Sequence, residues 1–182
     1  MPKVKKTTAL AVQPTPSQKG GGFKAAEYNA VATAAELLEI RLLKTNFGVE
    51  PEFYGVQDEA RLSFGREVLS CSFKPEDGTV AAIFKYHVYG KQGRSKLLKC
   101  EAEYAVIYAV PSSSPEEAAR GFCRNVGAFA AYPYFRALVS QLSWGAGVNL
   151  PPLPAIASTA HIPPKKPADD ALASNEQDEA LE

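Results

Sequence analysis

The sequence contains few of the residues that build disulfide frameworks, metal centres and catalytic sites. Its 182 residues include three cysteines and two histidines. Cys71, Cys100 and Cys123 have no Cys-x-x-Cys spacing, which argues against a zinc site and indicates reduced, half-buried thiols. His87 falls in a predicted strand and His161 in a polar tail, so the two do not suggest a compact site. We therefore expect no metal and no cofactor.

The sequence also has no excess of charge and no long apolar run. Lys and Arg number 20, Asp and Glu number 20, and the pI is about 6.7. A nucleic-acid partner is not expected, because such proteins usually carry a basic stripe. No window approaches the roughly 20 apolar residues of a membrane-spanning helix, and the run from Thr7 to Val12 is too short for a signal peptide. We predict a cytoplasmic protein without direct membrane insertion.

Three arrangements could carry chemistry, and each has a simpler structural explanation. A cysteine paired with His87 could act as a nucleophile, but Cys71 and Cys100 have the strand parity of buried positions. Glu101 and Glu103 could form an acid–base pair, but no neighbour separates their pKa values, so a solvated strand face is favoured. The glycines at 20–22 lack the Gly-Lys-Ser/Thr ending of a phosphate loop. We expect no enzyme.

The composition divides the chain into three parts. Residues 1–22 carry Lys, Thr, Pro and Gly and are predicted to be a disordered arm. Residues 23–157 contain the periodic apolar patterns of one folded domain. Residues 158–182 begin with a Pro/Lys run, end with acidic residues, and are predicted to be a disordered tail.

Alternating apolar residues predict an antiparallel sheet between helices. Strands are expected over 38–49, 62–73, 79–89 and 98–110, after a helix over 23–38 with a small-residue face. A change of apolar phase predicts a bulge in the first strand and a Gly65-marked irregularity in the second. A Ser-x-x-Glu capping box at Ser114 predicts a short helix that ends before Gly127. The fold class is α+β, a four-stranded antiparallel sheet with helices packed on one face.

The stretch from Ala131 to Ile156 organises the rest of the chain. Pro133 predicts the start of a second helix, and Gly145 a left-handed cap at its end. The apolar residues of this helix occupy two neighbouring rows, so it should pack against its own domain and also against another subunit. The predicted oligomer interface consists of Tyr134, Phe135, Leu138, Val139 and Leu142.

This stretch also resembles a known family. Tyr132-Pro133-Tyr134-Phe135-Arg136, a helix ending at Gly145, and Leu150-Pro151-Pro152-Leu153 resemble the signature of the SecB protein-export chaperones and of the SecB-like chaperones of toxin–antitoxin systems. The resemblance implies a non-catalytic subunit that assembles as a dimer of dimers, a homotetramer. It implies an ATP-independent holdase that binds unfolded or precursor proteins for export and translocation, or protects a client such as an antitoxin. The alternative is a non-catalytic adaptor that binds one folded partner.

Departures from the export pattern bear on the choice of branch. Glu101 matches one of the acidic residues with which export SecB proteins dock the SecA translocation motor. Lys44 and Gly48 stand where further carboxylates are expected, and Lys99 replaces an apolar residue. The helix before the first strand is more similar to the toxin–antitoxin branch. Both roles stay open on the sequence alone.

A holdase groove must stay apolar and open, which favours the proline-rich segment from Val148 to Ile156. Strand aromatics would form its floor, or would fill the subunit core instead. The predicted client-binding residues are Trp144, Val148, Leu150, Leu153 and Ile156 from the loop side, with Phe64, Phe73 and Tyr104 from the sheet.

Overall fold

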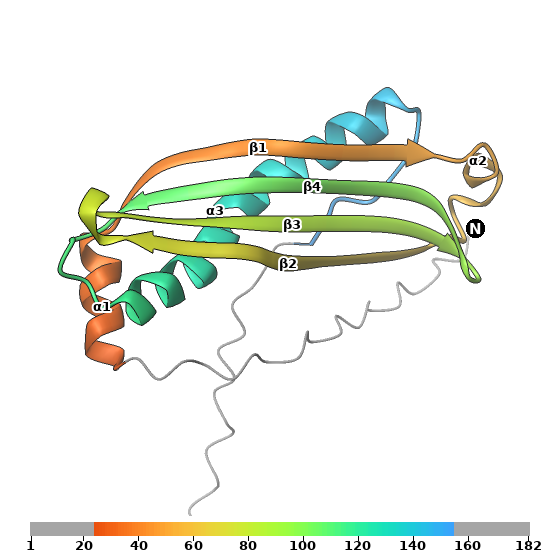
Figure 1. The fold of residues 1–182 in the computed structure, drawn as a ribbon. Helices are drawn as coiled ribbons and strands as arrows, with labels where there is room; N and C mark the ends of the chain where they lie inside the picture. The colour runs from red at the N-terminus through yellow and green to blue at the C-terminus, as the bar shows by residue number, and fades with distance from the viewer. Residues whose placement is uncertain (1–23, 155–182) are drawn as a thin grey trace, which may run out of the picture.

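The computed structural model describes residues 24–154, in which a long helix crosses one face of a four-stranded sheet (Figure 1). The elements are α1 (Ala25–Ala34), β1 (Glu36–Val49), α2 (Phe53–Val56), β2 (Arg61–Lys74), the 3-10 turn η1 (Pro75–Asp77), β3 (Thr79–Gln92), β4 (Ser95–Ala109) and α3 (Glu116–Gly145). None of the described helices is long and apolar enough to cross a membrane. The predicted arm, the predicted tail and Ile156 lie outside the described residues.

The sheet has the strand order β1-β4-β3-β2, with every neighbouring pair antiparallel. Strict alternation along β3 and β4 puts one set of side chains against α3. The buried set is Val80, Ala82, Phe84, Tyr86, Val88, Leu98, Cys100, Ala102, Tyr104, Val106 and Tyr108. The predicted four-stranded antiparallel sheet and the faces of its two central strands are therefore confirmed.

Irregularities shape the two edge strands. In β1 the pairing with β4 skips Leu38 and Leu43, so the predicted bulge is present and a second one precedes it. In β2 the pairing skips Leu69 and not Gly65, so the predicted site of that irregularity was wrong. Gly65 instead makes room on the outer face, because an added Cβ would lie 2.7 Å from Cε1 of His87. Bulges at both edges leave leucines exposed there.

α3 is one continuous helix of 30 residues, where the sequence predicted two. Gly127 does not end a helix but lets α3 approach the sheet, since an added Cβ would lie 3.0 Å from Cε2 of Phe84. Pro133 lies inside the helix at an exposed position. The predicted capping box was also wrong, because Pro115 is the N-cap residue and no side chain caps the helix. Packing against the sheet stabilises the helix through Gly127 and Pro133, the two residues that would locally favour a break.

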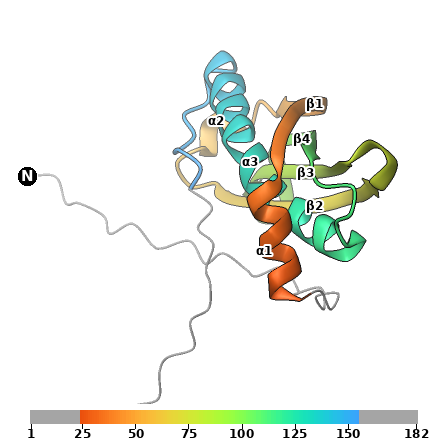
Figure 2. The same ribbon diagram turned by 90° about the vertical axis from the view of Figure 1, so that its left-hand side faces the viewer.

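α1 is shorter than predicted and buries a different face. It ends at Ala34, after which the chain enters β1 directly. Its one buried residue is Val31, whereas Ala26 and Ala30 of the predicted small-residue face are exposed. Tyr28 packs toward Phe122 of α3 with ring centroids 6.3 Å apart. Figure 2 shows α1 beside the first turns of α3, so this helix covers the start of α3.

Tyr86 links the two layers. Its ring stacks on Phe135 of α3 at a centroid distance of 5.2 Å. Its hydroxyl donates a hydrogen bond of 2.7 Å to the backbone oxygen of Ala128. Burial raises the pKa of Tyr86, so the phenol stays protonated and able to donate. The contact fixes the middle of α3 over the centre of the sheet.

Candidate functional site

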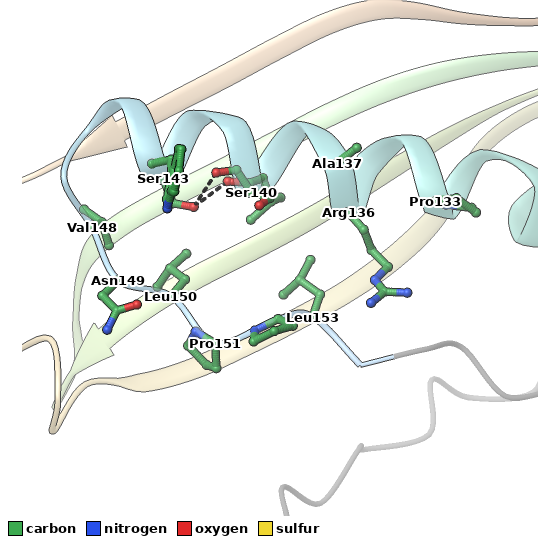
Figure 3. A pocket seen from close by; sticks show the side chains of 13 residues that line it. Pro133, Arg136, Ala137, Ser140, Ser143, Val148, Asn149, Leu150, Pro151 and Leu153 are labelled. Atoms are coloured by element: carbon green, nitrogen blue, oxygen red, sulfur yellow. Dashed lines mark hydrogen bonds between the residues drawn. The ribbon is translucent and has the colours of Figure 1, made fainter.

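A groove of about 380 Å³ lies between the second half of α3 and the segment that follows it (Figure 3). Residues of α3 from Pro133 to Trp144 form one wall. Residues from Val148 to Leu153 form the other, because the chain turns back after α3 and runs alongside the helix. The groove is therefore built by two consecutive pieces of the chain, and the sheet contributes no lining residue.

The end of α3 directs the chain back along the helix. Gly147 has a left-handed φ of 68° and its N–H donates to Trp144 O (3.0 Å), while the Val148 N–H donates to Ser143 O (2.8 Å). These two bonds define a Schellman motif, which satisfies the last carbonyls of a helix and reverses the chain. The predicted left-handed cap therefore exists, but at Gly147, and Gly145 is still helical. A glycine is favoured at this position because other residues rarely adopt positive φ.

Three hydrogen bonds hold this returning segment in place. Tyr132 donates its hydroxyl to Pro154 O (2.6 Å), and Tyr54 donates to Ala146 O (2.8 Å). The N–H of Asn149 donates to Oε1 of Gln57 (3.4 Å). The prolines at 151, 152 and 154 restrict the backbone between these anchors. The groove walls are therefore fixed at a separation that keeps the groove open.

The lining is apolar at its base and carries a large exposed aromatic ring at its rim. Val148 and Leu153 are buried, Leu150 is half-buried, and Trp144 is 88% exposed. Buried Ser143 adds no free polar atom, because its hydroxyl donates to Val139 O (2.6 Å). Such a surface suits an apolar segment supplied from outside, since an apolar ligand would cover Trp144 and bury further area.

One cation extends into the groove. Figure 3 shows the side chain of Arg136 reaching from α3 toward the returning segment. No carboxylate among residues 24–154 lies within ion-pair distance of its guanidinium. Its charge lowers the pKa of Tyr132, against the larger effect of burial, which raises it. Arg136 can therefore meet an acidic group on a bound segment.

Four of the eight predicted client-binding residues line this groove together, namely Trp144, Val148, Leu150 and Leu153. The three sheet residues do not. Tyr104 is 4% exposed and packs edge-on against Tyr86, at a centroid distance of 6.1 Å. Phe64 and Phe73 are half-buried on the edge strand β2. These three residues pack in or against the core, the alternative that the sequence left open.

The sequence reasoning identified Trp144 of the helical wall of the groove and missed the other residues of that wall. The signal that could have identified it is the spacing of Pro133, Arg136, Ser140 and Trp144, which places them on one helical face. That face is mixed in polarity, so it does not stand out as an apolar stripe.

The five predicted interface residues divide into two groups. Phe135 is 1% exposed and Val139 is 3% exposed, both packed inside the subunit, so their assignment to an interface was wrong. The reason is that their row of the helix faces the sheet. The other row stays available, since Tyr134 is 55% exposed and Leu138 and Leu142 are half-buried.

Glu101 lies on the outer face of the sheet and is already paired. Tyr89 donates its hydroxyl to Oε1 (2.6 Å), and the ammonium groups of Lys99 and Lys85 lie 3.2 Å and 3.6 Å from Oε2. The Tyr89 hydrogen bond, followed by these lysines, lowers the pKa of Glu101 against the opposing effect of burial. The ammonium of Lys96 lies 3.9 Å from the centroid of the Tyr89 ring. Positive charge thus surrounds this carboxylate.

The geometry separates the groups of the Cys–His alternative. His87 lies on the outer face, where its ring stacks on Tyr89 at 4.7 Å. Cys71 and Cys100 point to the inner face, because they pair with and alternate like the buried residues of β3. The sheet therefore stands between the imidazole and either thiol. Within residues 24–154, no cluster of three or more His, Cys, Asp or Glu side chains could hold a metal ion.

Comparison with known proteins gives a match in structure and none in sequence. No protein-family model and no curated protein matches the chain. Among solved structures, it is similar to the SecB-like chaperone Rv1957 of Mycobacterium tuberculosis in complex with a ChAD peptide from the HigA1 antitoxin. The TM-score is 0.61 at 19% sequence identity, over 72% of this chain and 97% of the mycobacterial one.

The chain has the SecB-like fold. The fold class predicted from the sequence is therefore confirmed, with the difference that one long helix covers the sheet instead of two. The SecB-like fold thus provides this chain with a central sheet and a helix whose second half forms an open groove.

Proposed function

We propose that this protein is an ATP-independent holdase that binds an extended apolar segment of a specific client protein. The observation that carries the proposal is the exposed Trp144 at the rim of a fixed groove with an apolar base. The fold supports it, because the similar mycobacterial protein is a chaperone in complex with an antitoxin peptide. The proposal includes no chemical step and no cofactor.

The binding energy would come from burial of apolar surface. Such contacts are non-directional, so they hold many extended sequences without a nucleotide-driven step. The walls are already ordered by the Schellman motif and the Tyr132–Pro154 hydrogen bond, which reduces the entropy that binding must overcome. The edge strand β2 has one side without a partner in the described sheet, so an extended client can add backbone hydrogen bonds there.

The client is better described as an antitoxin-like protein than as an export precursor. Glu101 is paired with Lys99 and Lys85 and hydrogen-bonded by Tyr89, so it presents little free negative charge to a basic motor tail. Lys44 and Gly48 provide no carboxylate beside it on β1. We propose that the client carries an acidic residue next to its apolar segment, which would pair with Arg136.

The assembly we propose is a homotetramer, a dimer of dimers. The row of Tyr134, Leu138 and Leu142 is incompletely covered within one subunit. Leu37 and Leu42 of β1 are 45% and 43% exposed on the same side of the sheet, because they pair with inward-facing residues of β4. A second subunit that covers both sets would bury apolar surface that one subunit leaves in water.

The test combines aggregation and fluorescence. Because Trp144 is the only tryptophan, its emission should shift when an apolar peptide with an acidic residue is added. The protein should suppress aggregation of a chemically unfolded substrate without ATP. Leu150→Asp should weaken both effects by about tenfold or more, since it places a charge in the groove. Leu43→Asp is the matched control, because Leu43 is exposed at a β1 bulge, far along the chain from the groove segment.

Two outcomes would contradict the proposal. If the protein leaves aggregation unchanged at equimolar amounts and instead binds one folded protein tightly, it is an adaptor. If it binds clients while Trp144 emission stays fixed and Leu150→Asp has no effect, the client site lies elsewhere.

A further inference from the structure

The outer face of the sheet carries three cations in one row, at the end where β3 turns into β4. Arg61 of β2 lies opposite Lys91 of β3, and Lys91 lies opposite Lys96 of β4. Lys91 belongs to the outward set of β3, which alternates with buried residues, and paired residues share a face. We call Arg61, Lys91 and Lys96 the cationic row. Lys99, which lies opposite Tyr89, adds a fourth cation beside it.

Contacts with the Tyr89 ring place two of these ammonium groups over the outer face. The ammonium of Lys96 lies 3.9 Å from the ring centroid, and that of Lys91 lies 5.7 Å from it. His87 stacks on the same ring at a centroid distance of 4.7 Å. The ring is therefore already in contact with an imidazole and a cation. This arrangement disfavours a stacked nucleobase and favours an acidic peptide as the partner of the row.

The cationic row has no counter-ions of its own in the described domain. No carboxylate among residues 24–154 lies within ion-pair distance of its three members. The nearby carboxylate of Glu101 is taken by Lys99 and Lys85, at 3.2 Å and 3.6 Å. Like charges directly opposite each other destabilise a sheet. An anionic segment across the row would remove this repulsion and would match the row in charge.

The chain itself contains such a segment, at residues 169–182. This acidic segment has no Lys or Arg. Its carboxylates belong to Asp169, Asp170, Glu176, Asp178, Glu179 and Glu182. Several carboxylates spaced along one segment can meet several cations at once, as a row across three strands requires.

The acidic segment can reach the outer face. Residues 155–168 separate it from Pro154, whose backbone oxygen accepts a hydrogen bond from Tyr132 on the helix side of the sheet. A stretch of that length spans up to roughly 50 Å. The strand β3 has 14 residues and is therefore roughly 46 Å long. The chain is thus long enough to pass around the sheet, and tethering lets weak ion pairs hold the segment there.

We propose that the acidic segment 169–182 binds across the cationic row on the outer face of the sheet. Its carboxylates pair with Arg61, Lys91 and Lys96, and the row directs it across β2, β3 and β4. None of these residues lines the groove between α3 and the returning segment. The inference therefore does not depend on the proposed holdase function.

The first experiment is zero-length carbodiimide cross-linking of the unmutated full-length chain, followed by peptide mapping. The expected products join carboxylates of the acidic segment to Lys91 or Lys96. Their yield should fall severalfold between about 0.01 M and about 1 M salt, because the Debye length shortens from about 30 Å to about 3 Å. The mapping uses no variant, so it does not depend on whether a substituted chain folds.

The second experiment uses a full-length chain in which Asn or Gln replaces every carboxylate of the acidic segment. A labelled peptide of residues 169–182 should bind this chain about tenfold or more tightly than the unmutated chain, whose own segment competes. Adding Lys91→Glu with Lys96→Glu should abolish that gain. Lys24→Glu with Lys74→Glu is the matched control. It makes the same charge change at two exposed lysines away from the row, and should keep the gain.

Three results would overturn the proposal. The first is a set of cross-links that fall on Lys3, Lys5 or Lys6 and not on the row. The second is an equal affinity of the peptide for the unmutated and the amide-substituted chains. The third is single-stranded DNA that binds to the row in the amide-substituted chain where the peptide does not, which would assign the row to a nucleic acid.

Discussion

The two halves of α3 are one helix with two environments. From Glu116 to Phe135, ten residues are buried, and most of them are small. From Arg136 to Gly145, only Val139 and Ser143 are buried. Figure 1 shows why, because α3 runs diagonally across the strands and its second half has less sheet behind it. The first half is held by the sheet, and the second half is free to build a groove with the returning segment.

The difference teaches how one element combines rigidity with an open binding surface. Small residues such as Gly127 and Ala128 let the first half approach the sheet closely, so the helix is fixed by packing. The second half continues the same helix, so it is held rigid as well, although few of its residues are buried. Substitution of its exposed residues should therefore change the free energy of unfolding little, whereas substitution of the buried residues of the first half should lower it.

The largest effect is expected where the first half meets the sheet. Phe135→Ala should lower the free energy of unfolding by about 3–5 kcal/mol, because it leaves a cavity against Tyr86. Urea unfolding at a fixed protein concentration measures the loss. Trp144→Ala is the comparison from the second half, since its ring is 88% exposed, and it should change stability by less than about 0.5 kcal/mol. Similar losses in the two variants would show that the halves do not differ as described.

A smaller effect is expected at the half-buried row, and it should appear in assembly. Leu138→Asp should dissociate the proposed tetramer while each subunit stays folded, because a buried, unpaired carboxylate costs at least about 2 kcal/mol. Sedimentation measures the assembly, and circular dichroism measures the fold. Gln141→Asp, at an exposed position of the same helix, should keep the assembly. An intact, folded tetramer for Leu138→Asp would remove this row from the interface.

The central strands could be predicted from the sequence because they are half-buried. Along β3 and β4 every second residue is buried on the side of α3. The alternation of apolar and polar residues is therefore visible in the sequence even when the helix that covers the sheet is unknown. α3 was divided in error because Gly127 and Pro133 look like breakers locally. What overrides them is the contact of Gly127 with Phe84, which joins residues far apart in the chain and leaves no local pattern.

The groove could be predicted only in part, for a related reason. The proline-rich loop identified Val148, Leu150 and Leu153 by composition. Its direction depends on the positive φ at Gly147 and on the hydrogen bond from Tyr132 to Pro154, and neither follows from periodicity. The returning segment therefore faces α3, where the sequence reasoning had placed it over the sheet.

The smallest effect on stability, and a clear one on binding, is expected at Trp144. Trp144→Ala should change the free energy of unfolding by less than about 0.5 kcal/mol, because the side chain is 88% exposed. It should weaken binding of an apolar peptide by about tenfold or more, since exposed aromatic rings at binding sites are frequent hot spots. Anisotropy of a labelled peptide measures the affinity, as the variant has no tryptophan.

Tyr54→Phe is a suitable comparison, because it removes the hydrogen bond to Ala146 but leaves the groove lining intact. A large loss of stability in Trp144→Ala would mean that this ring is covered by another subunit. An unchanged peptide affinity would mean that clients do not bind to this ring. Either result would contradict the division of α3 into a structural half and a binding half.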